Sequence, residues 1–261
     1  MARPVVALLT DFGLHDHYVG TMKGVVLSVC PEAALVDITH DISPQDLTVA
    51  ALELAAAYPY FPPGTVFLVV VDPGVGSSRR AIAAEAGGYY FVGPDNGVFS
   101  VVFRQSPPGL VVELKERKYA RSTISCTFEG RDRFAPAAGW IARQTSLSAF
   151  GPLVVDYTTL PIPQPTIAER KIRGEVTRID RFGNLMTNIT SEMLESLAIP
   201  IVVSIADRQN IPFVRTYAEA GAGELCALVG SSGHVEIALN GSNASERLRA
   251  GRGTPVVVST L

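Results

Sequence analysis

Two acidic residues stand where a reactive site could form in this sequence. Asp11 and Asp72 each follow a short apolar run, Val5 to Thr10 and Thr65 to Val71. Such runs are typical of strands buried on both faces of a parallel sheet, and ligands of these sheets bind beyond the carboxyl ends of the strands. We therefore expect Asp11 and Asp72 to be site acids. The competing interpretation is that each caps a helix or a turn, which is the commoner role of a single Asp.

A glycine-rich loop with two arginines follows the second acid directly. In residues 72–80 (DPGVGSSRR), Gly74 and Gly76 let the backbone turn sharply and approach a ligand. The arginine pair returns toward Asp72 across the loop. The Gly-Lys-Ser/Thr ending of a P-loop is missing, so a nucleotide-phosphate site of that kind is not predicted. A purely structural tight turn is the alternative interpretation.

Three further segments combine charged or amide side chains with turn-forming residues. Residues 93–97 (GPDNG) and 180–184 (DRFGN) are typical first of turns, and the second of them separates two short strands. Residues 128–136 (FEGRDRFAP) hold four charges before an apolar helix, which Asp132 is suited to cap. Each segment could also border a binding site, and its composition alone leaves both interpretations open.

The histidines do not form a recognised metal site. His15, Asp16 and His17 are adjacent and could bind a metal loosely, but the sequence has no HExxH or comparable spacing. We predict no metal ion.

The elements that must position these residues alternate in the first half of the chain. A helix is expected from about Tyr18 to Cys30, a strand from Ala33 to Thr39, and a second helix to about Tyr58. Ser43 is the expected N-cap of this second helix, with Pro44 at its first position. Strands alternating with helices predict an α/β domain with a mainly parallel central sheet.

The pattern changes after a proline-rich stretch at 152–165. Short β-like runs separated by Gly, Asn and Ser then follow, and they predict a small barrel or sandwich. These runs are 173–180, 185–190, 201–205, 212–216, 225–229, 234–239 and 255–260. We therefore expect an N-terminal α/β domain with a linker at its end over residues 1–163, and a smaller all-β domain over 164–261.

Composition excludes several classes of protein. The chain has 261 residues, with 22 Lys plus Arg against 25 Asp plus Glu, and this net charge of −3 argues against binding nucleic acid through phosphate contacts. Hydrophobic residues make up 47% and charged residues 18%, enough to bury a core, yet no run approaches a membrane span. Three widely spaced cysteines suggest neither a disulfide framework nor a metal site, so a cytoplasmic protein is expected.

Taken together and in order, these motifs resemble the S-adenosylmethionine (SAM) hydroxide adenosyltransferase family, the adenosine-forming SAM hydrolases related to fluorinases and chlorinases. The motifs are LTDFG at 9–13, YVGTMKG at 18–24, the 72–80 loop, GPDNG at 93–97, GRD at 130–132, DRFGN at 180–184 and EIALN at 236–240. The resemblance implies cleavage of SAM at the ribose C5′ by water, without a cofactor. It also implies a homotrimer whose sites lie between the N-terminal domain of one subunit and the C-terminal domain of the next.

The resemblance assigns roles to individual residues. Asp72 and Arg79 match two of the three family residues that handle the attacking water, and Glu129 stands where the usual pattern has a histidine. The substrate-binding matches are Asp11 at the ribose diol, Asp16 and Asp180 at the methionine end, Phe182 and Asn184 at the adenine, and Ser231, Glu236 and Gly241 on the remaining wall. A carboxylate suits a diol because it can accept two hydroxyl hydrogen bonds.

Three other function classes are considered. A SAM-dependent halogenase would use a related pocket, but its relatives carry a Tyr-containing sequence in place of the Asp-Pro-Gly loop, and Asp72 would repel a halide. A sensor or sink that only binds SAM or adenosine would follow if Glu129 abolished catalysis. A purely structural trimer is disfavoured by the many polar residues at expected strand ends.

Overall fold

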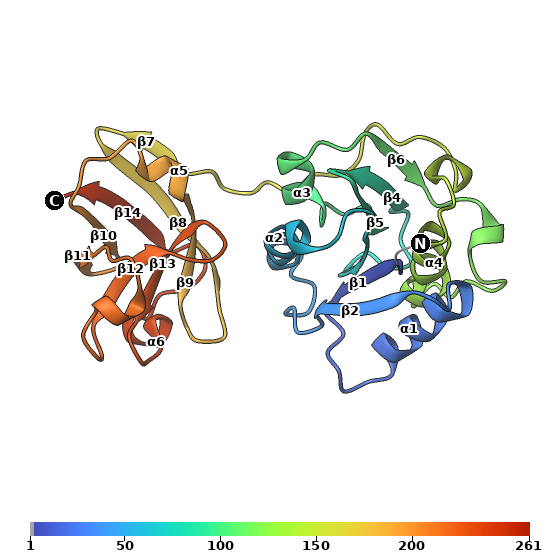
Figure 1. Cartoon of the computed structure of the whole chain (residues 1–261), viewed down its shortest axis with the longest axis horizontal. Helices are drawn as coiled ribbons and strands as arrows, with labels where there is room; N and C mark the ends of the chain where they lie inside the picture. The colour runs from blue at the N-terminus through green and yellow to red at the C-terminus, as the bar shows by residue number, and fades with distance from the viewer. Residues whose placement is uncertain (1–2) are drawn as a thin grey trace. The chain divides into compact units, whose positions relative to one another are not determined.

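The computed structural model describes residues 3–261, and the chain divides into a first unit ending at Pro161 and a second running from Ile162 to Leu261 (Figure 1). The first unit is a six-stranded sheet with helices on both faces. Its elements are β1 (Val5–Thr10), α1 (Tyr18–Val29), β2 (Ala34–Thr39), α2 (Leu47–Ala57), β3 (Val66–Val70), β4 (Ala81–Ala86), β5 (Tyr89–Pro94), α3 (Ser100–Gln105), β6 (Leu110–Glu113) and α4 (Ala135–Ala142).

The sheet of the first unit is mixed. Its strand order is β2-β1-β3-β5-β4-β6; the first four strands are parallel, while β4 runs antiparallel to both its neighbours. The expectation of a mainly parallel sheet holds for those four strands and needs correction at β4. The cause is local: only Gly87 and Gly88, both with positive φ, join β4 to β5, and a two-residue connection can join only antiparallel strands.

The strand order changes direction between β1 and β3. From β1 the chain crosses to β2 on one side, and it then returns to β3 on the other side of β1. Thr10 and Val70 are register partners at the ends of these strands, so Asp11 and Asp72 both lie just beyond the same sheet edge. This point of reversal is where open α/β sheets bind ligands.

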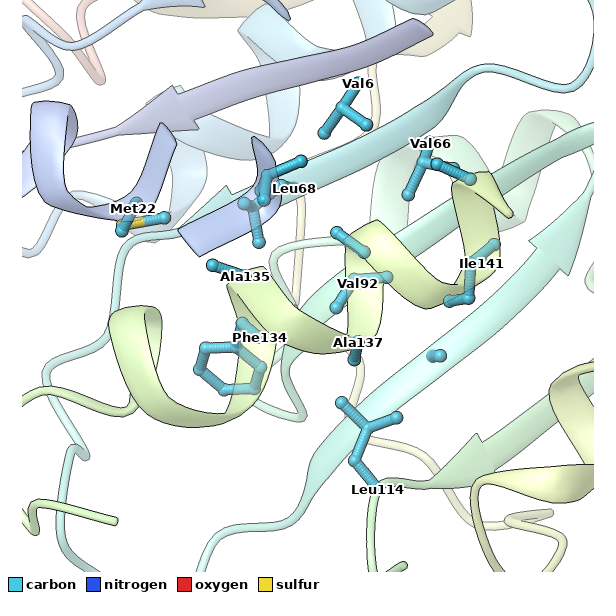
Figure 2. Close-up of a cluster of buried hydrophobic side chains, with 14 of the residues drawn as sticks. Val6, Met22, Val66, Leu68, Val92, Leu114, Phe134, Ala135, Ala137 and Ile141 are labelled. Carbon is cyan, nitrogen blue, oxygen red and sulfur yellow. The ribbon is translucent and has the colours of Figure 1, made fainter. Parts of the chain in front are cut away.

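Two hydrophobic layers hold the helices to the sheet. On one face, side chains of α1 and α4 pack with strand residues, among them Met22, Ile141 and Leu68 (Figure 2). Burying each of these large side chains contributes about 1.5–3 kcal/mol. α1 and α4 approach so closely that a Cβ on Gly139 would lie 2.8 Å from the Cβ of Val29. On the other face, α2 and α3 cover a second cluster built around Phe67 and Phe91.

The start of α2 differs from the expectation. Asp46, not Ser43, is the N-cap, and its Oδ1 accepts a hydrogen bond from the backbone N of Val49 at 3.0 Å. Gln45 has a φ of 67°, which is outside the helical region, so the helix cannot include Pro44. The first helix begins at Tyr18, as predicted, and ends at Val29.

The second unit is a nearly closed antiparallel barrel. Its elements are β7 (Thr166–Ala168), β8 (Lys171–Ile179), β9 (Leu185–Thr190), α5 (Ser191–Leu194), β10 (Ile201–Ile205), β11 (Arg208–Pro212), β12 (Leu225–Val229), β13 (His234–Leu239), α6 (Ala244–Leu248) and β14 (Pro255–Thr260). The order is β11-β10-β14-β8-β9-β13-β12, and a bridge between Phe213 and Ala227 brings the two edges together. The barrel-like form is confirmed. The strand expected at 212–216 is wrong. The strand in this region is β11 at 208–212, which pairs with β10 through Arg208, Ile211 and Pro212.

No helix among residues 3–261 is both long and apolar enough to cross a membrane.

Candidate active site

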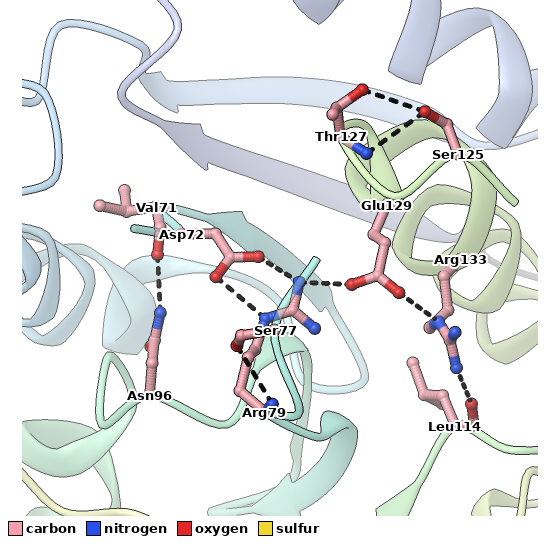
Figure 3. A network of polar contacts seen from close by, with 10 residues as sticks. All are labelled: Val71, Asp72, Ser77, Arg79, Asn96, Leu114, Ser125, Thr127, Glu129 and Arg133. Atoms are coloured by element: carbon pink, nitrogen blue, oxygen red, sulfur yellow. Dashed lines mark hydrogen bonds and ion pairs between the residues drawn. The ribbon is translucent and has the colours of Figure 1, made fainter. Parts of the chain in front are cut away.

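An arginine lies between two carboxylates just beyond the carboxyl end of β3. The Nε of Arg79 donates to Oδ1 of Asp72 at 3.0 Å, and its Nη2 contacts both Oδ2 of Asp72 and Oε2 of Glu129 (Figure 3). None of the three side chains is more than 12% exposed. The structure thus brings together the three residues to which the family resemblance assigns catalysis.

The charge of this arginine is held fixed by its surroundings. Burial of the guanidinium by itself lowers the pKa of Arg79, but the hydrogen bonds and charges of Asp72 and Glu129 outweigh it and raise that pKa above its ordinary value. The ring of Phe134 lies 5.4 Å from the guanidinium carbon and covers part of the side chain. Arg79 is therefore a permanent cation that orients its partners and cannot accept a proton.

The two carboxylates are not equivalent. Oε1 of Glu129 lies 3.0 Å from Nε of Arg133, whose Nη1 donates to the carbonyl of Leu114 at 2.9 Å (Figure 3). Each Glu129 oxygen therefore faces a different arginine, whereas both oxygens of Asp72 share Arg79 alone. The Asp72 carboxylate thus has one cationic partner, whereas the Glu129 carboxylate has two.

The loop that carries Arg79 depends on a glycine. Gly76 has a φ of 78°, and a Cβ there would lie 2.6 Å from the carbonyl oxygen of Cys126. On the other side of Asp72, Nδ2 of Asn96 donates to the carbonyl of Val71 at 2.9 Å. The segment is therefore a tight turn that also carries Arg79 into the cluster. Its expected approach to a ligand stays a prediction.

The neighbouring charged residues have structural partners. Nε of Arg80 donates to Oδ2 of Asp95 at 2.8 Å, and its Nη1 donates to Asp156 at 2.6 Å. Oδ1 of Asp95 accepts from the backbone N of Thr158 at 2.7 Å. The 93–97 segment thus anchors the chain near residue 157 in addition to holding Val71.

Asp132 does not cap α4, contrary to the expectation. It lies inside a single π-helical turn, Gly130–Phe134, that precedes α4, and it is fully buried. Its two oxygens accept from Nε and Nη2 of Arg131, both at 2.7 Å, and Oδ2 also accepts from the backbone N of Ser125 at 2.9 Å. Because the helical turn begins before Asp132, no unpaired helix end remains there for it to cap. Glu129 sits at the start of the same turn.

The two acids that precede α1 differ in surroundings. Asp11 is half-buried, and its Oδ2 accepts a hydrogen bond from the backbone N of Gln45 at 2.8 Å. Asp16 is exposed in the turn that leads into α1. Asp11 is thus held in place at the sheet edge that also carries Asp72.

The second unit contains a cavity of about 640 Å³ that gathers six of the predicted binding residues. This is within the size range of small-molecule sites. The six are Asp180, Phe182, Asn184, Ser231, Glu236 and Gly241. They come from the β8–β9 loop, from the segment between β12 and β13, from β13 itself and from the residues after it. Segments far apart in the sequence therefore meet at one concave surface.

The β8–β9 loop is shaped by its own aspartate. Oδ1 of Asp180 accepts from the backbone N of Phe182 and of Asn184, both at 2.9 Å, and Oδ2 accepts from Nδ2 of Asn184 at 2.9 Å. A Cβ on Gly183 would lie 2.2 Å from the Asn243 side chain. This ordered hairpin leaves the Phe182 ring 77% exposed, available to stack on a planar ligand.

Glu236 is the buried acid of the cavity wall. It is 3% exposed, and the hydroxyl of Tyr217 donates to its Oε1. Burial raises the pKa of Glu236, and the charge of Asp180 adds to this, although the bond from Tyr217 opposes it. The chain makes room for the carboxylate at Gly230, where a Cβ would lie 2.2 Å from Oε2 of Glu236.

Sequence reasoning missed several residues of this wall. Met186 is the register partner of both Arg178 and Glu236, so these three side chains are neighbours across β8, β9 and β13. Their position follows from strand register, which two-residue alternation alone does not give. Tyr217 lies in a long connection with no motif.

Within residues 3–261, no group of three or more His, Cys, Asp or Glu side chains is arranged to hold a metal ion.

Comparisons with known proteins agree over most of the chain. Residues 6–151 match the model of the SAM hydroxide adenosyltransferase N-terminal domain, and residues 174–257 match that of the C-terminal domain. An (R)-S-adenosyl-L-methionine hydrolase of Thermus thermophilus is 39% identical over 97% of this chain and 98% of its own. One of Salinispora tropica is 37% identical over 94% of each chain.

More distant and structural relatives complete the comparison. A fluorinase of an Actinoplanes species is 26% identical over 91% of each chain. The crystal structure of an uncharacterised conserved protein from Thermotoga maritima superposes with a TM-score of 0.93 at 35% identity, covering 97% of this chain and 99% of that one.

Proposed function

The chain belongs to the SAM hydroxide adenosyltransferase family, and we propose that it hydrolyses S-adenosyl-L-methionine at the ribose C5′ to adenosine and L-methionine. The observation that carries the mechanism is the buried Asp72–Arg79–Glu129 cluster at the switch point of the sheet. It offers a proton acceptor, a fixed cation and a second carboxylate at the sheet edge that also carries Asp11, the half-buried residue that would hold the ribose.

The reaction needs alignment of water more than acid catalysis. The water oxygen attacks C5′ and the C5′–S bond breaks, with its electron pair going to sulfur. Methionine leaves as a neutral thioether, so no proton need be donated to it. The proton lost by water goes to Asp72, because Arg79 is a permanent cation and Glu129 is held between two arginines. Glu129 then serves to orient Arg79.

The binding roles follow the division of residues between the two units. Asp11 accepts the ribose hydroxyls, and Asp16 and Asp180 attract the methionine ammonium group. Phe182 stacks on the adenine and Asn184 hydrogen-bonds its edge, with Ser231, Glu236 and Gly241 completing the wall. The cavity that gathers the last six of these residues supports this assignment.

Halogenation is the less favoured reaction. In that reaction a halide anion would have to bind beside the carboxylates of Asp72 and Glu129, and these negative charges would repel it. The fluorinase relatives are also more distant than the hydrolases, at 26% identity against 39%. Binding of SAM without turnover is the outcome expected if the cluster cannot activate water.

Product analysis tests the proposal. We expect purified protein incubated with SAM to form adenosine and methionine in equal amounts, with the rate unchanged by a chelator, because the proposed mechanism uses no metal. The substrate should be supplied as both sulfonium epimers, since the hydrolase relatives are named for the (R) form. Formation of methylthioadenosine, or loss of activity to the chelator, would refute the proposal. Tight binding of SAM with no product would indicate a sensor.

We also propose a homotrimer whose sites use the first unit of one subunit and the second unit of the next. The expected result is a trimer by light scattering, together with complementation between two inactive variants. Asp72→Asn and Asn184→Ala proteins, unfolded and refolded together, should regain activity, because some mixed trimers contain a site with neither substitution. The same variants refolded separately are the control. A fully active monomer, or no recovery in confirmed mixed trimers, would contradict the shared site.

A cytoplasmic location remains part of the proposal. Cys30 and Cys226 are buried and Cys126 is exposed, and none of the three forms a disulfide. Unpaired thiols are typical of proteins in a reducing compartment.

A further inference from the structure

A buried histidine lies beside the strand end that carries Asp11, and the proposed mechanism does not use it. His40 follows β2 directly and is 4% exposed. Its Nδ1 lies 2.8 Å from Oγ1 of Thr10, the fully buried last residue of β1. Its Nε2 lies 3.0 Å from Oδ1 of Asp37, whose Oδ2 accepts from Lys23 of α1 at 2.6 Å. Four polar side chains thus form a chain from α1 to the end of β1.

The contacts define the direction of the hydrogen bonds. Burial alone would raise the pKa of Asp37, but Lys23 and His40 lower it below its ordinary value, so Asp37 is a carboxylate that can only accept. Nε2 of His40 faces this carboxylate in an ion-pair contact at 3.0 Å. With the proton of a neutral imidazole on Nε2, the other ring nitrogen accepts from the hydroxyl of Thr10. Oγ1 of Thr10 in turn accepts from the backbone N of Phe12 at 3.3 Å.

His40 holds the chain on both sides of Asp11. Its ring binds Thr10, the residue before Asp11, and its carbonyl accepts from the backbone N of Gly13 at 2.8 Å. Asp11 is thereby fixed between two anchored residues, while its own Oδ2 accepts from Gln45. A carboxylate that must accept two ribose hydroxyls depends on such a fixed orientation.

We propose that His40 is a positioning residue that sets the Asp11 carboxylate for the ribose diol through Thr10, with Asp37 holding the imidazole in the required tautomer. The inference rests on the proposed function, since it takes Asp11 to bind the ribose. It predicts that loss of the Thr10–His40 bond weakens recognition of the diol. A merely structural role would lower stability without changing which ligands are preferred.

The test compares variants that keep or remove that one bond. Thr10→Val removes the hydroxyl at nearly constant volume. His40→Gln places its amide near the position of Nε2, and His40→Asn places its amide near that of Nδ1, where it can still accept from Thr10. Thr65→Val is the matched control: Thr65 is also buried, and its hydroxyl donates to the carbonyl of Pro62 at 2.7 Å, before the opposite end of β3. All variants are first checked for native circular dichroism.

The expected readout is a change in KM and in diol selectivity. Thr10→Val and His40→Gln should raise the KM for SAM about tenfold, which corresponds to a loss of about 1.4 kcal/mol of binding free energy. The kcat of both variants should stay within about twofold of the parent, because the diol contact is equally strong in the ground state and in the transition state. Their preference for adenosine over 2′,3′-dideoxyadenosine, measured by calorimetry, should fall by the same factor. His40→Asn and Thr65→Val should both show the parental KM for SAM and the parental preference for adenosine over 2′,3′-dideoxyadenosine.

Two results would overturn the inference. One is folded Thr10→Val protein with parental KM and parental diol selectivity. The other is equal behaviour of the Asn and Gln variants at His40. Failure of the proposed function is distinguishable from both, because it would appear as a parent protein that forms no adenosine from SAM.

Discussion

Asp72→Asn is expected to lower kcat for SAM hydrolysis by about a hundredfold to ten-thousandfold, the usual cost of losing a positioned general base. The affinity for SAM should stay near that of the parent, because an amide occupies the same space and can still accept a bond from Arg79. The fold should persist as well, since Glu129 continues to pair with Arg79. Single-turnover kinetics together with calorimetric SAM titration separate the two effects.

Glu129→Gln is the comparison that assigns the base. If Glu129 only orients Arg79, Glu129→Gln should lower kcat far less than Asp72→Asn does. Asp156→Asn, at an exposed aspartate paired with Arg80, is the control for loss of a charge in the same unit. Equal losses at Asp72 and Glu129 would make the glutamate a full catalytic partner. An unchanged rate in Asp72→Asn would overturn the mechanism.

Asp132→Asn is expected to destabilise the first unit by about 3 kcal/mol at neutral pH, the lower end of the cost of breaking a buried ion pair. Asp132 is fully buried, but its partner Arg131 is partly exposed and can be hydrated when the charge is lost. Burial alone would raise the pKa of Asp132, but Arg131, the backbone N of Ser125 and Arg121 outweigh it and lower that pKa.

The sign of this shift predicts the pH dependence. A folded-state pKa below the unfolded value adds stability that is present above the ordinary Asp pKa and is lost as the pH falls through that range. The difference in unfolding free energy between the parent and Asp132→Asn should therefore be largest near neutral pH and should shrink below about pH 4. Urea unfolding across this range measures it. Asp207→Asn, at an exposed site, is the control, and a difference that grows on acidification would contradict the account.

The parts of the fold that could be predicted are those with strong local signals. Residues 5–10 and 66–70 are continuous apolar runs, and they form two adjacent inner strands that are followed by Asp11 and Asp72. β4 gave no such signal, because Ala81–Ala86 contains only one β-branched residue and takes its place through pairing with β5 and β6. The sequence pattern therefore does not predict the antiparallel strand β4.

The candidate site, like the fold, could be predicted only where the signal is local in the sequence. The 72–80 loop and the 180–184 hairpin were recognisable because their glycines, acids and arginines are close in sequence. The Tyr217 contact with Glu236 and the Thr10–His40 pair depend on how distant segments pack. The Arg133 contact with Glu129 depends on the helical turn that brings residues four apart together. The sequence predicts a cap at Asp132 because this residue precedes an apolar helix. It does not reveal the π-helical turn, Gly130–Phe134, that encloses Asp132 before α4 begins.

The origin of the new oxygen atom tests the central claim most directly. The protein is incubated with SAM in water enriched in heavy oxygen, and adenosine and methionine are analysed by mass spectrometry. Attack of water on C5′ predicts one heavy oxygen in each adenosine, at the 5′ hydroxyl, and none in methionine. Adenosine without the label, or label in methionine, would contradict cleavage by an activated water at C5′.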